Sequence, residues 1–378
     1  MNIIVSTHDS LYPLQGGGAL RTLKAAQDFK DKGHDVVIIA PAENKSEIDG
    51  IKIHWLHPPR KQRSQILSSF KFNVRLLRKF LCFAKETDVF FIHNTISAAS
   101  MPFLKKFFKF KFALDITDIH AEYLPIGKRD IFERILTPYL IAYEYRIIRS
   151  ADSVIAATEA MKSLLIKKGI DRDRIKVVYD GVDNKSFQAE KEPGSEKSII
   201  HLGAIDRQHG LDLLIRAAAL VVKNNPGAKF LFVGGGRELS NIKKLAGGLK
   251  VQESCIFTGS LPYEQAKIYL NESGIGVIPR RGYLANRIIT TLKLYEYWAS
   301  GTAVVSSRLE GITEIAQDYE DILFFDPGSA EDLAEKIDLL IKDNALRLKL
   351  TENGLQKAAN FNWSKSAPKI TEHALNAG

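Results

Sequence analysis

Two charged residues near position 300 have the spacing of a ligand-binding pair. Lys293 and Glu296 lie three residues apart at the start of a segment with a helical pattern that ends at Gly301, so both side chains would share one helix face. A helix N-terminus attracts anions, and a lysine in its first turn adds a point charge for a phosphate. A glutamate one turn later can accept two hydrogen bonds from a ribose diol. The pair therefore indicates a nucleoside diphosphate site, although an ordinary exposed Lys–Glu pair has the same spacing.

Short, nearly continuous apolar segments alternate with helical patterns along the chain, as in parallel sheets that are covered on both faces. In the first half we expect strands at 2–7, 35–40, 51–56, 88–92, 112–116, 153–156 and 175–178. In the second half we expect strands at 198–202, 229–233, 254–258, 275–279, 302–306 and 321–325. Two such sets predict an α/β protein with two doubly wound, Rossmann-like domains that face each other across a cleft.

Chain length and a polar segment suggest where the domains divide. A chain of 378 residues is too long for one compact core. Residues 185–197 are polar and include Pro193 and Gly194, so they are the best candidate for a linker. We expect a first domain over 1–185 and a second domain over 186–360.

The net charge of +9 belongs to the first half of the chain. Residues 1–185 carry 30 Lys and Arg against 21 Asp and Glu, whereas the remainder carries 23 of each. The excess is concentrated at 60–85, which includes Arg75, and at 105–112, which begins with Lys105. Both stretches interleave basic residues with phenylalanines, which suits an anionic membrane surface. They are equally consistent with phenylalanines in the core and charges in water, and no nucleic-acid recognition module accompanies them.

Other sequence features point to a reduced compartment and to chemistry without a metal. Cys82 and Cys255 lie far apart, and the chain has no Asp-x-Asp pair and no cluster of His, Cys and carboxylates with ligand spacing. Residues 1–5 run directly into a strand without a leader pattern, and no apolar run approaches the ~20 residues that span a bilayer. We expect a cytoplasmic protein that can bind peripherally to the inner face of the cell membrane.

Ligands in open α/β sheets bind at the carboxyl ends of the strands, and this rule selects candidate loops. In the first half it selects the glycine-rich loop 7–18, His93 and the segment 115–120. Asp118 or His120 could act there as a base for an acceptor hydroxyl or contact a sugar; helix capping and loop packing are the structural alternatives. In the second half it selects loops 203–210, 234–238, 259–262 and 279–281 together with the Lys293 helix.

A series of short motifs in a fixed order resembles the family 4 glycosyltransferases of the GT-B architecture. Each motif alone is weak, but the series runs through nearly the whole chain. The matching segments are Gly16–Gly18, Lys32–Val36, Ala151–Ala156, Tyr179–Asp183, Leu202–Gly203, His209–Gly210, Phe232–Gly236, Phe257–Gly259, Lys293–Gly301 and Gly311–Glu314. Asp115–Asp118 looks like the Asp-x-Arg-Asp stretch of a subgroup that builds surface polysaccharides and lipid-linked glycans, with Thr117 in place of the arginine.

The resemblance implies a retaining hexosyltransferase that needs no metal and takes a nucleoside-diphosphate sugar in its C-terminal lobe. The expected donor contacts are Gly17, Gly18, Gly203, Arg207, His209, Gly235, Gly259, Leu261, Arg280, Lys293, Leu294 and Glu296. The expected catalytic residues are Asp118, His120 and Lys293. A glycan or polyprenyl-linked acceptor would bind the N-terminal lobe, and its expected contacts are His93, Asp118, Arg75 and Lys105. The last helix, about 361–378, would pack back on that lobe.

Three positions depart from the family pattern. The family has two glutamates eight positions apart, and Ile288 stands where the first would precede Glu296. Ala204 and His209 replace an arginine and a lysine that in the family contact the diphosphate. These departures keep two alternatives open: a non-catalytic, membrane-associated sugar-nucleotide-binding partner of another transferase, and a GT-B sugar-nucleotide epimerase.

Overall fold

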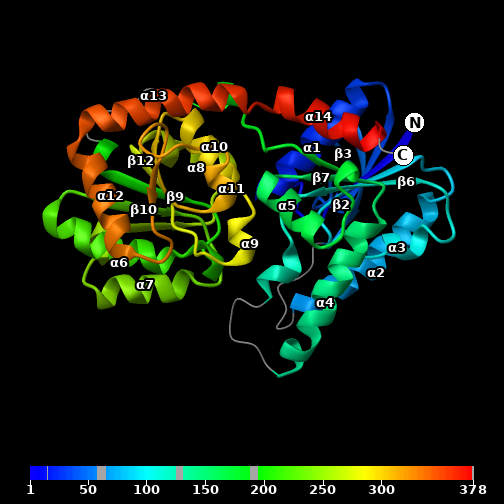
Figure 1. The fold of residues 1–378 in the computed structure, drawn as a ribbon, viewed down its shortest axis with the longest axis horizontal. Coiled ribbons are helices and arrows are strands. Elements are labelled where there is room, and N and C mark those ends of the chain that lie inside the picture. Colours follow the sequence, from blue (N-terminus) through cyan, green and yellow to red (C-terminus); the bar gives the residue numbers. More distant parts are fainter. Residues whose placement is uncertain (15, 58–64, 125–130, 188–194, 377–378) are drawn as a thin grey trace. The chain divides into compact units, whose positions relative to one another are not determined.

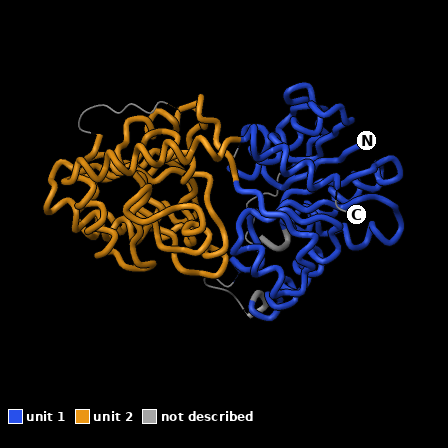
Figure 2. Tube along the Cα trace, turned by 45° about the horizontal axis from the view of Figure 1, so that its top comes forward, with its two compact units in different colours: residues 1–179, 363–378 blue, residues 180–362 orange. Residues whose placement is uncertain are grey.

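The computed structural model describes residues 1–378 except 15, 58–64, 125–130, 188–194 and 377–378 (Figure 1). The chain divides into two compact units (Figure 2). Unit 1 comprises 1–179 and 363–378, and unit 2 comprises 180–362. The C-terminal segment thus belongs to the unit that contains the N-terminus.

Unit 1 is built on one eight-stranded sheet. Its strands are β1 (Asn2–Ser6), β2 (Asp35–Pro41), β3 (Glu47–Ile48), β4 (Ile51–Leu56), β5 (Val89–His93), β6 (Lys111–Ile116), β7 (Ser153–Ala156) and β8 (Ile175–Val177). The strand order is β3-β4-β2-β1-β5-β6-β7-β8, and every pair is parallel except β3 with β4. Because the central strands are buried on both faces, they are mostly apolar, and the polar side chains His93 and Asp115 lie at or near their carboxyl ends.

The helices of unit 1 lie on both sides of this sheet. They are α1 (Gly16–Asp31), α2 (Gln65–Phe83), α3 (Met101–Leu104), α4 (Ile131–Ser150), α5 (Glu159–Lys167) and α14 (Trp363–Asn376), with a short 3-10 helix η1 (His120–Tyr123). Helices α1 and α14 pack together on one side, and α2, α3 and α4 lie on the other (Figure 1). Right-handed crossovers give this arrangement, because the chain moves across the sheet in one direction from β1 to β2 and in the other from β4 to β7.

Unit 2 repeats the design with six parallel strands. They are β9 (Ser198–Leu202), β10 (Lys229–Val233), β11 (Cys255–Gly259), β12 (Ile275–Ile278), β13 (Ala303–Ser307) and β14 (Leu323–Phe325), in the order β11-β10-β9-β12-β13-β14. The helices are η5 (Arg207–His209), α6 (Leu211–Asn224), α7 (Leu239–Gly248), α8 (Tyr263–Asn271), α9 (Leu284–Arg287), α10 (Leu292–Ala299), α11 (Glu310–Thr313), α12 (Ala330–Lys342) and α13 (Asn344–Asn360).

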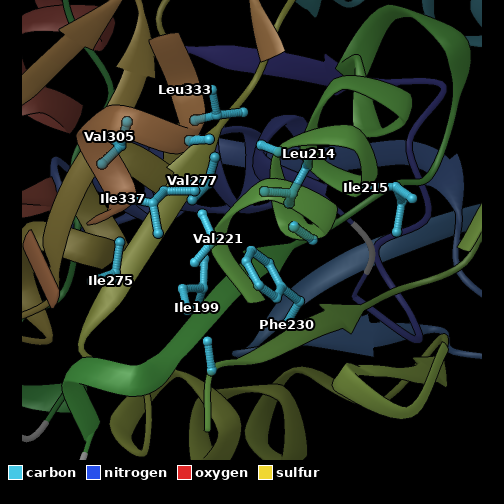
Figure 3. Packing of buried hydrophobic residues seen from close by; sticks show 14 of the residues in the cluster. Ile199, Leu214, Ile215, Val221, Phe230, Ile275, Val277, Val305, Leu333 and Ile337 are labelled. Carbon is cyan, nitrogen blue, oxygen red and sulfur yellow. The ribbon is translucent and has the colours of Figure 1, made fainter. Parts of the chain in front are cut away.

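The core of unit 2 follows from the spacing of apolar residues in its helices. In α6 the buried residues recur every three or four positions, so one stripe of the helix faces the sheet. Figure 3 shows Leu214 and Val221 of this stripe near Ile199 and Phe230 of the sheet, with Leu333 of α12 in the same cluster. This packing holds the strands whose carboxyl ends carry the candidate site.

The predicted fold class, two doubly wound α/β domains, is confirmed. Strands occur in all thirteen segments that the apolar pattern selects, with ends that differ by one or two residues. The structure adds the two-residue strand β3. It also divides the basic stretch at 105–112, since only Lys111 and Phe112 of that stretch belong to β6.

Candidate functional site

Lys293 and Glu296 occupy the first two turns of α10, as their spacing predicts, but neither is on the surface. The side chains of Tyr295 and Trp298 anchor the opposite part of the helix in the core. Only 8% of Lys293 and 5% of Glu296 is exposed. The interpretation as an ordinary solvated Lys–Glu pair is therefore wrong, because both charges are buried.

The ammonium of Lys293 lies over Gly203, at the carboxyl end of β9. A Cβ atom at Gly203 would lie 3.4 Å from the Lys293 Nζ atom, and the φ of +121° at this position favours glycine. The lysine thus lies at the boundary between β9 and β12, from which the chain continues in opposite directions across the sheet, to β10 and to β13. Doubly wound folds bind ligands at such a point.

Three further basic side chains gather around Lys293, and we call the four the basic cluster. They are Arg280 after β12, His201 in β9 and His209 in η5, and all three are buried. The two imidazole rings lie 6.2 Å apart. Arg280 donates through Nη1 to the Oδ1 atom of Asn286 at 3.1 Å. Within the described residues, Arg280 Nε, His201 Nε2 and His209 Nδ1 are buried without a hydrogen-bond partner.

Burial and neighbouring positive charges lower the pKa values of Lys293, His201 and His209 in the basic cluster. Burial, followed by the charge of Arg280, lowers the pKa of Lys293 to about 7. Burial and then the charge of Lys293 hold the pKa values of His201 and His209 well below the usual range, so both imidazoles are neutral at pH 7. Buried polar atoms without partners are rare, and within the described residues the buried Lys293 and Arg280 lack the direct contact with a carboxylate that buried cations normally have. The cluster is thus suited to an anion.

Glu296 does not neutralise this cluster by direct pairing. Its Oε1 atom accepts a hydrogen bond of 2.8 Å from the hydroxyl of Tyr263, the first residue of α8. Burial raises the pKa of Glu296, and the bond to Tyr263 and the charge of Lys293 oppose that rise. The tyrosine fixes one carboxylate oxygen beside the cationic cluster, in an arrangement that could bind sugar hydroxyl groups.

The other expected donor contacts lie in different surroundings. Gly235 lies in the loop after β10, Gly259 ends β11 and Leu261 lies in the loop after it, all at the same edge of the sheet. Arg207 is exposed in η5, and its neighbour His209 rather than Arg207 joins the cluster. Leu294 is completely buried in the core, so only its backbone could face a ligand.

Gly17 and Gly18 belong to unit 1 rather than to the unit with the basic cluster. They lie in the first turn of α1. A Cβ atom at Gly18 would approach Asp9 Oδ2 to 2.3 Å and His93 Nε2 to 2.6 Å. Gly18 therefore permits close packing beside His93.

A second buried network occupies the carboxyl edge of the unit 1 sheet. Arg21 of α1 donates two hydrogen bonds of 2.8 Å to the carboxylate of Asp115, and both side chains are fully buried. Burial would raise the pKa of Asp115, but the charge of Arg21 together with the hydrogen bonds from His93 and Arg21 outweighs it, and the pKa falls to about 2. The ionised carboxylate lies 2.9 Å from His93 Nδ1, so that nitrogen carries the proton. The Nε2 atom of His93 then accepts from the side-chain amide of Asn94 at 3.1 Å.

Asn94 connects this network to the loop that contains Asp118. Its Oδ1 atom accepts from the backbone N–H groups of Thr117, at 3.0 Å, and Asp118, at 3.3 Å. The Asp118 carboxylate accepts a bond of 2.9 Å from the hydroxyl of Tyr123. The structure thus brings His93 and Asp118 to one edge, as the strand-end rule predicts.

A buried glutamate on α4, Glu144, bonds to the backbone of the segment that contains His120. Glu144 accepts from the backbone N–H groups of His120, at 3.0 Å, and Ala121, at 2.7 Å, and also from the hydroxyl of Thr95. Burial raises the pKa of Glu144 to about 7. The His120 ring meets the ring of His8 edge-on at 5.0 Å, and burial followed by the charge of His8 lowers its pKa to about 3. His120 is therefore a neutral imidazole.

Two expected acceptor contacts do not join this network. Lys105 lies just after α3 and pairs with Asp152, which immediately precedes β7, and also donates to the Ser150 carbonyl at 3.0 Å. It therefore lies at the amino edge of the sheet, opposite His93. Arg75 is exposed on α2. Residues 60–64 of the basic stretch lie outside the described residues.

Sequence reasoning missed several members of both networks. His201 is a lone imidazole near the end of an apolar strand, and that position is a usable signal. Arg21 and Glu144 look like ordinary charges on amphipathic helices, and their partners lie 94 and 23 or more residues away. Only the fold brings these groups together.

Metal-ligand clusters and membrane-spanning helices are both absent from the described residues. No group of three or more His, Cys, Asp or Glu side chains in that part of the chain has a geometry that could hold a metal ion. Within the same residues, every helix is too short or too polar to cross a membrane.

Family models match both units. The model described as "Glycosyltransferase Family 4" matches residues 15–186, and the model "Glycosyl transferases group 1" matches residues 182–357. An uncharacterised glycosyltransferase of Methanocaldococcus jannaschii is 25% identical in an alignment 370 residues long. The alignment covers 92% of each of the two chains.

Solved structures share the fold at low sequence identity. WaaG, a glycosyltransferase involved in lipopolysaccharide biosynthesis, superposes with a TM-score of 0.77 at 15% identity, over 99% of this chain and 100% of that one. HepE of Anabaena, in complex with UDP-glucose, gives a TM-score of 0.78 at 16% identity over 98% of both chains. At these identities the structures show the fold alone, and the family models add the assignment. The chain belongs to the family 4 type of glycosyltransferases with the GT-B fold.

Proposed function

We propose that this glycosyltransferase moves a hexosyl group from a nucleoside-diphosphate sugar to a hydroxyl of a glycan or lipid-linked acceptor, with retention of the anomeric configuration. The donor would bind unit 2 and the acceptor unit 1. One observation carries the proposal: the basic cluster of Lys293, Arg280, His201 and His209 is buried at a strand-end position typical of ligand sites, and three of its nitrogen atoms lack partners.

In this proposal the basic cluster binds the diphosphate of the donor, and Glu296 binds its ribose. The diphosphate would accept hydrogen bonds from Lys293, Arg280 and His209. Lys293 would supply the positive charge that the uncharged Ala204 and His209 cannot supply. The ribose diol would bond to the Glu296 oxygen that Tyr263 orients. The HepE neighbour was solved with UDP-glucose, which makes UDP-sugars the first donors to test.

The chemical step places negative charge where these cations lie. The bond between the anomeric carbon and the diphosphate oxygen breaks, and a bond to the acceptor oxygen forms on the same face of the sugar. Departure leaves a further negative charge on the diphosphate, and fixed positive groups that stabilise it lower the barrier. We propose that Lys293 and Arg280 carry out this neutralisation without a metal ion.

On the acceptor side, the proposal assigns the carboxyl edge of unit 1. Asp115 holds the His93 ring through Nδ1, with Nε2 beside the side-chain amide of Asn94. His120 is neutral and Asp118 lies on the same loop, so both can contact the acceptor hydroxyl, whose proton passes to the departing diphosphate oxygen. An acceptor carried on a polyprenyl lipid would place the reaction at the inner face of the cell membrane.

Nucleotide binding tests the donor assignment. Calorimetry with UDP, GDP, ADP and dTDP, in the presence of a chelator, should show that one ribonucleotide binds the wild type. Glu296→Ala should weaken it by tenfold or more, since a buried charge-assisted hydrogen bond is lost. Glu264→Ala is the control, because that glutamate on α8 is exposed and pairs with Lys267.

The outcomes separate the alternatives. If none of the four nucleotides binds, the donor assignment is wrong. Binding without sugar transfer or donor hydrolysis would favour the binding-only protein, and an altered sugar on the recovered nucleotide would favour the epimerase. The anomeric configuration of the product, read by NMR, tests retention.

A further inference from the structure

Helix α2 has two apolar faces, and only one of them is in the core. The buried face consists of Phe72, Leu76 and Phe80. On the opposite side Phe70, Val74 and Leu81 recur at intervals of four and seven residues, which places them in one stripe along the helix. All three are exposed, and 65% of Phe70 is accessible. Burying a second apolar stripe requires a partner outside the sheet.

Helix α4 has the same feature. Its residues Ile135, Tyr139 and Tyr143 are spaced by four, so they share one face, and 64% of Ile135 and 70% of Tyr139 are accessible. Arg146 and Arg149 continue this exposed side toward the end of the helix. An exposed stripe of isoleucine and tyrosine is unusual for a helix that otherwise covers a sheet.

The charges that flank these stripes have one sign. The exposed or partly exposed basic residues of α2 are Lys71, Arg75, Arg78 and Lys79. None of the four forms an ion pair within the described part of the chain, and α2 contains no acidic residue. At the described exposed positions of α2 and α4 there is no carboxylate, since Glu144 is buried. The partner should therefore be apolar and anionic.

The topology gives both stripes the same orientation. Helices α2 and α4 cover the same side of the unit 1 sheet (Figure 1), and each follows a parallel strand. Their second turns, with Phe70 and Ile135, therefore lie toward the carboxyl edge, where His93 and Asp118 lie. Their later turns, with Arg78 and Arg146, lie toward the amino edge.

We infer that the exposed faces of α2 and α4 form an interfacial surface that binds anionic lipid. Apolar side chains on an amphipathic helix enter the boundary between headgroups and acyl chains, and adjacent lysines and arginines bind acidic headgroups. The exposed stripes of α2 and α4 supply the apolar side chains, and the basic residues of α2 supply the lysines and arginines. This surface deepens the proposed function, because a lipid-borne acceptor would then arrive at the carboxyl edge of unit 1, but the surface itself is inferred from unit 1 alone.

Vesicle flotation of the full chain tests the surface. Wild type should float with vesicles of equal parts phosphatidylcholine and phosphatidylglycerol, and much less with phosphatidylcholine alone. The triple variant Phe70→Ser, Val74→Ser, Leu81→Ser should partition at least tenfold less. Arg75→Gln with Arg78→Gln should also lose about tenfold or more, since each basic residue contributes about fivefold near an anionic surface, and the remaining binding should be less sensitive to salt.

The matched control is the double variant Ile268→Ser, Leu348→Ser, which removes two exposed apolar residues from helices of unit 2. It should float like wild type. The inference is overturned if wild type does not float with the anionic vesicles, or if the stripe variant floats as well as the control. Binding of single-stranded RNA without vesicle binding would reassign the basic surface to nucleic acid. Calorimetry with nucleotides, done on the same proteins, reports separately on the donor site.

Discussion

The two units bury positive charge in opposite ways. In unit 1, Arg21 is fully buried and makes two hydrogen bonds to the equally buried Asp115. In unit 2, Lys293 and Arg280 are buried together with two histidines, and within the described residues neither cation pairs with a carboxylate. The first arrangement is complete without a ligand, whereas the second has no carboxylate in direct contact with its cations within the described residues.

This difference separates structural charge from functional charge. A buried cation that makes two hydrogen bonds to a carboxylate has a structural role. Here Arg21 positions Asp115, and Asp115 fixes the tautomer of His93. A buried cation without a carboxylate makes the empty protein less stable, and it retains the charge that an anionic ligand needs. Substitutions should therefore act in opposite directions on stability in the two units.

The largest effect on stability is expected at the complete pair. Arg21→Met leaves Asp115 buried without its main partner and should lower the free energy of unfolding by about 3–5 kcal/mol. The double variant Arg21→Met, Asp115→Leu should recover much of that loss, because no uncompensated charge remains. Urea denaturation measures both. If the double variant is no more stable than the single one, packing of the arginine rather than charge is responsible.

The Arg21–Asp115 pair should also contribute to the fall in the free energy of unfolding at acid pH. The pKa of Asp115 falls from 3.8 to about 2 on folding. A lowered carboxyl pKa stabilises the folded state above the unfolded value, and the contribution is lost as the pH falls from about 4 through 2. Arg21→Met should reduce this pH dependence.

Lys293→Met should affect catalysis strongly and stability in the reverse direction. Loss of a cation at the departing diphosphate should reduce turnover by about 10²–10³-fold. The ligand-free variant should be at least as stable as wild type at pH 7, because a poorly compensated buried charge is removed. Lys244→Met, at an exposed position of α7, is the control. A variant that loses as much stability as Arg21→Met would show that Lys293 is compensated after all.

The pH dependence of wild type should reveal the same lysine. Burial and Arg280 lower the pKa of Lys293 from 10.5 to about 7. Between these values the unfolded state binds more protons, so the stability of the ligand-free protein should rise as the pH rises from 7. Lys293→Met should lose that slope.

Glu144→Gln should give a smaller effect, confined to unit 1. The amide keeps the size of the side chain but replaces one acceptor oxygen with a donor, opposite the N–H groups of His120 and Ala121. We expect a loss of about 1–3 kcal/mol and weaker acceptor binding. Because the pKa of Glu144 rises from 4.5 to about 7 on folding, its contribution is greatest below 4.5 and is lost as the pH rises through 7. Unfolding measured from pH 5 to 8 should be flatter in the variant; an identical slope in both proteins would contradict the assignment.

The sequence predicts what depends on local patterns and misses what depends on distant partners. Apolar runs gave the strands because parallel strands are buried on both faces, and strand ends gave His93 and Asp118. The spacing of Lys293 and Glu296 predicted that both lie on one face of a helix, now α10, but not that they are buried, which depends on Tyr263 and the Arg280 loop. Arg21 carries no local signal, since its partner Asp115 lies on another element.

Lys105 shows where the strand-end rule could have been applied more strictly. It precedes β6 in the chain, and in a parallel sheet the residues before a strand lie at the amino edge, away from His93. Its partner Asp152 precedes β7 and is partly exposed. Lys105→Gln should therefore change the acceptor KM less than twofold and cost about 1 kcal/mol or less in stability, as for other partly exposed ion pairs. Steady-state kinetics with the acceptor, compared with those of Asp118→Asn, measure this difference. A large rise in KM for Lys105→Gln would mean that the acceptor extends along the whole face of α3 and α4 to the amino edge, and the functional division between the two edges of unit 1 would then be wrong.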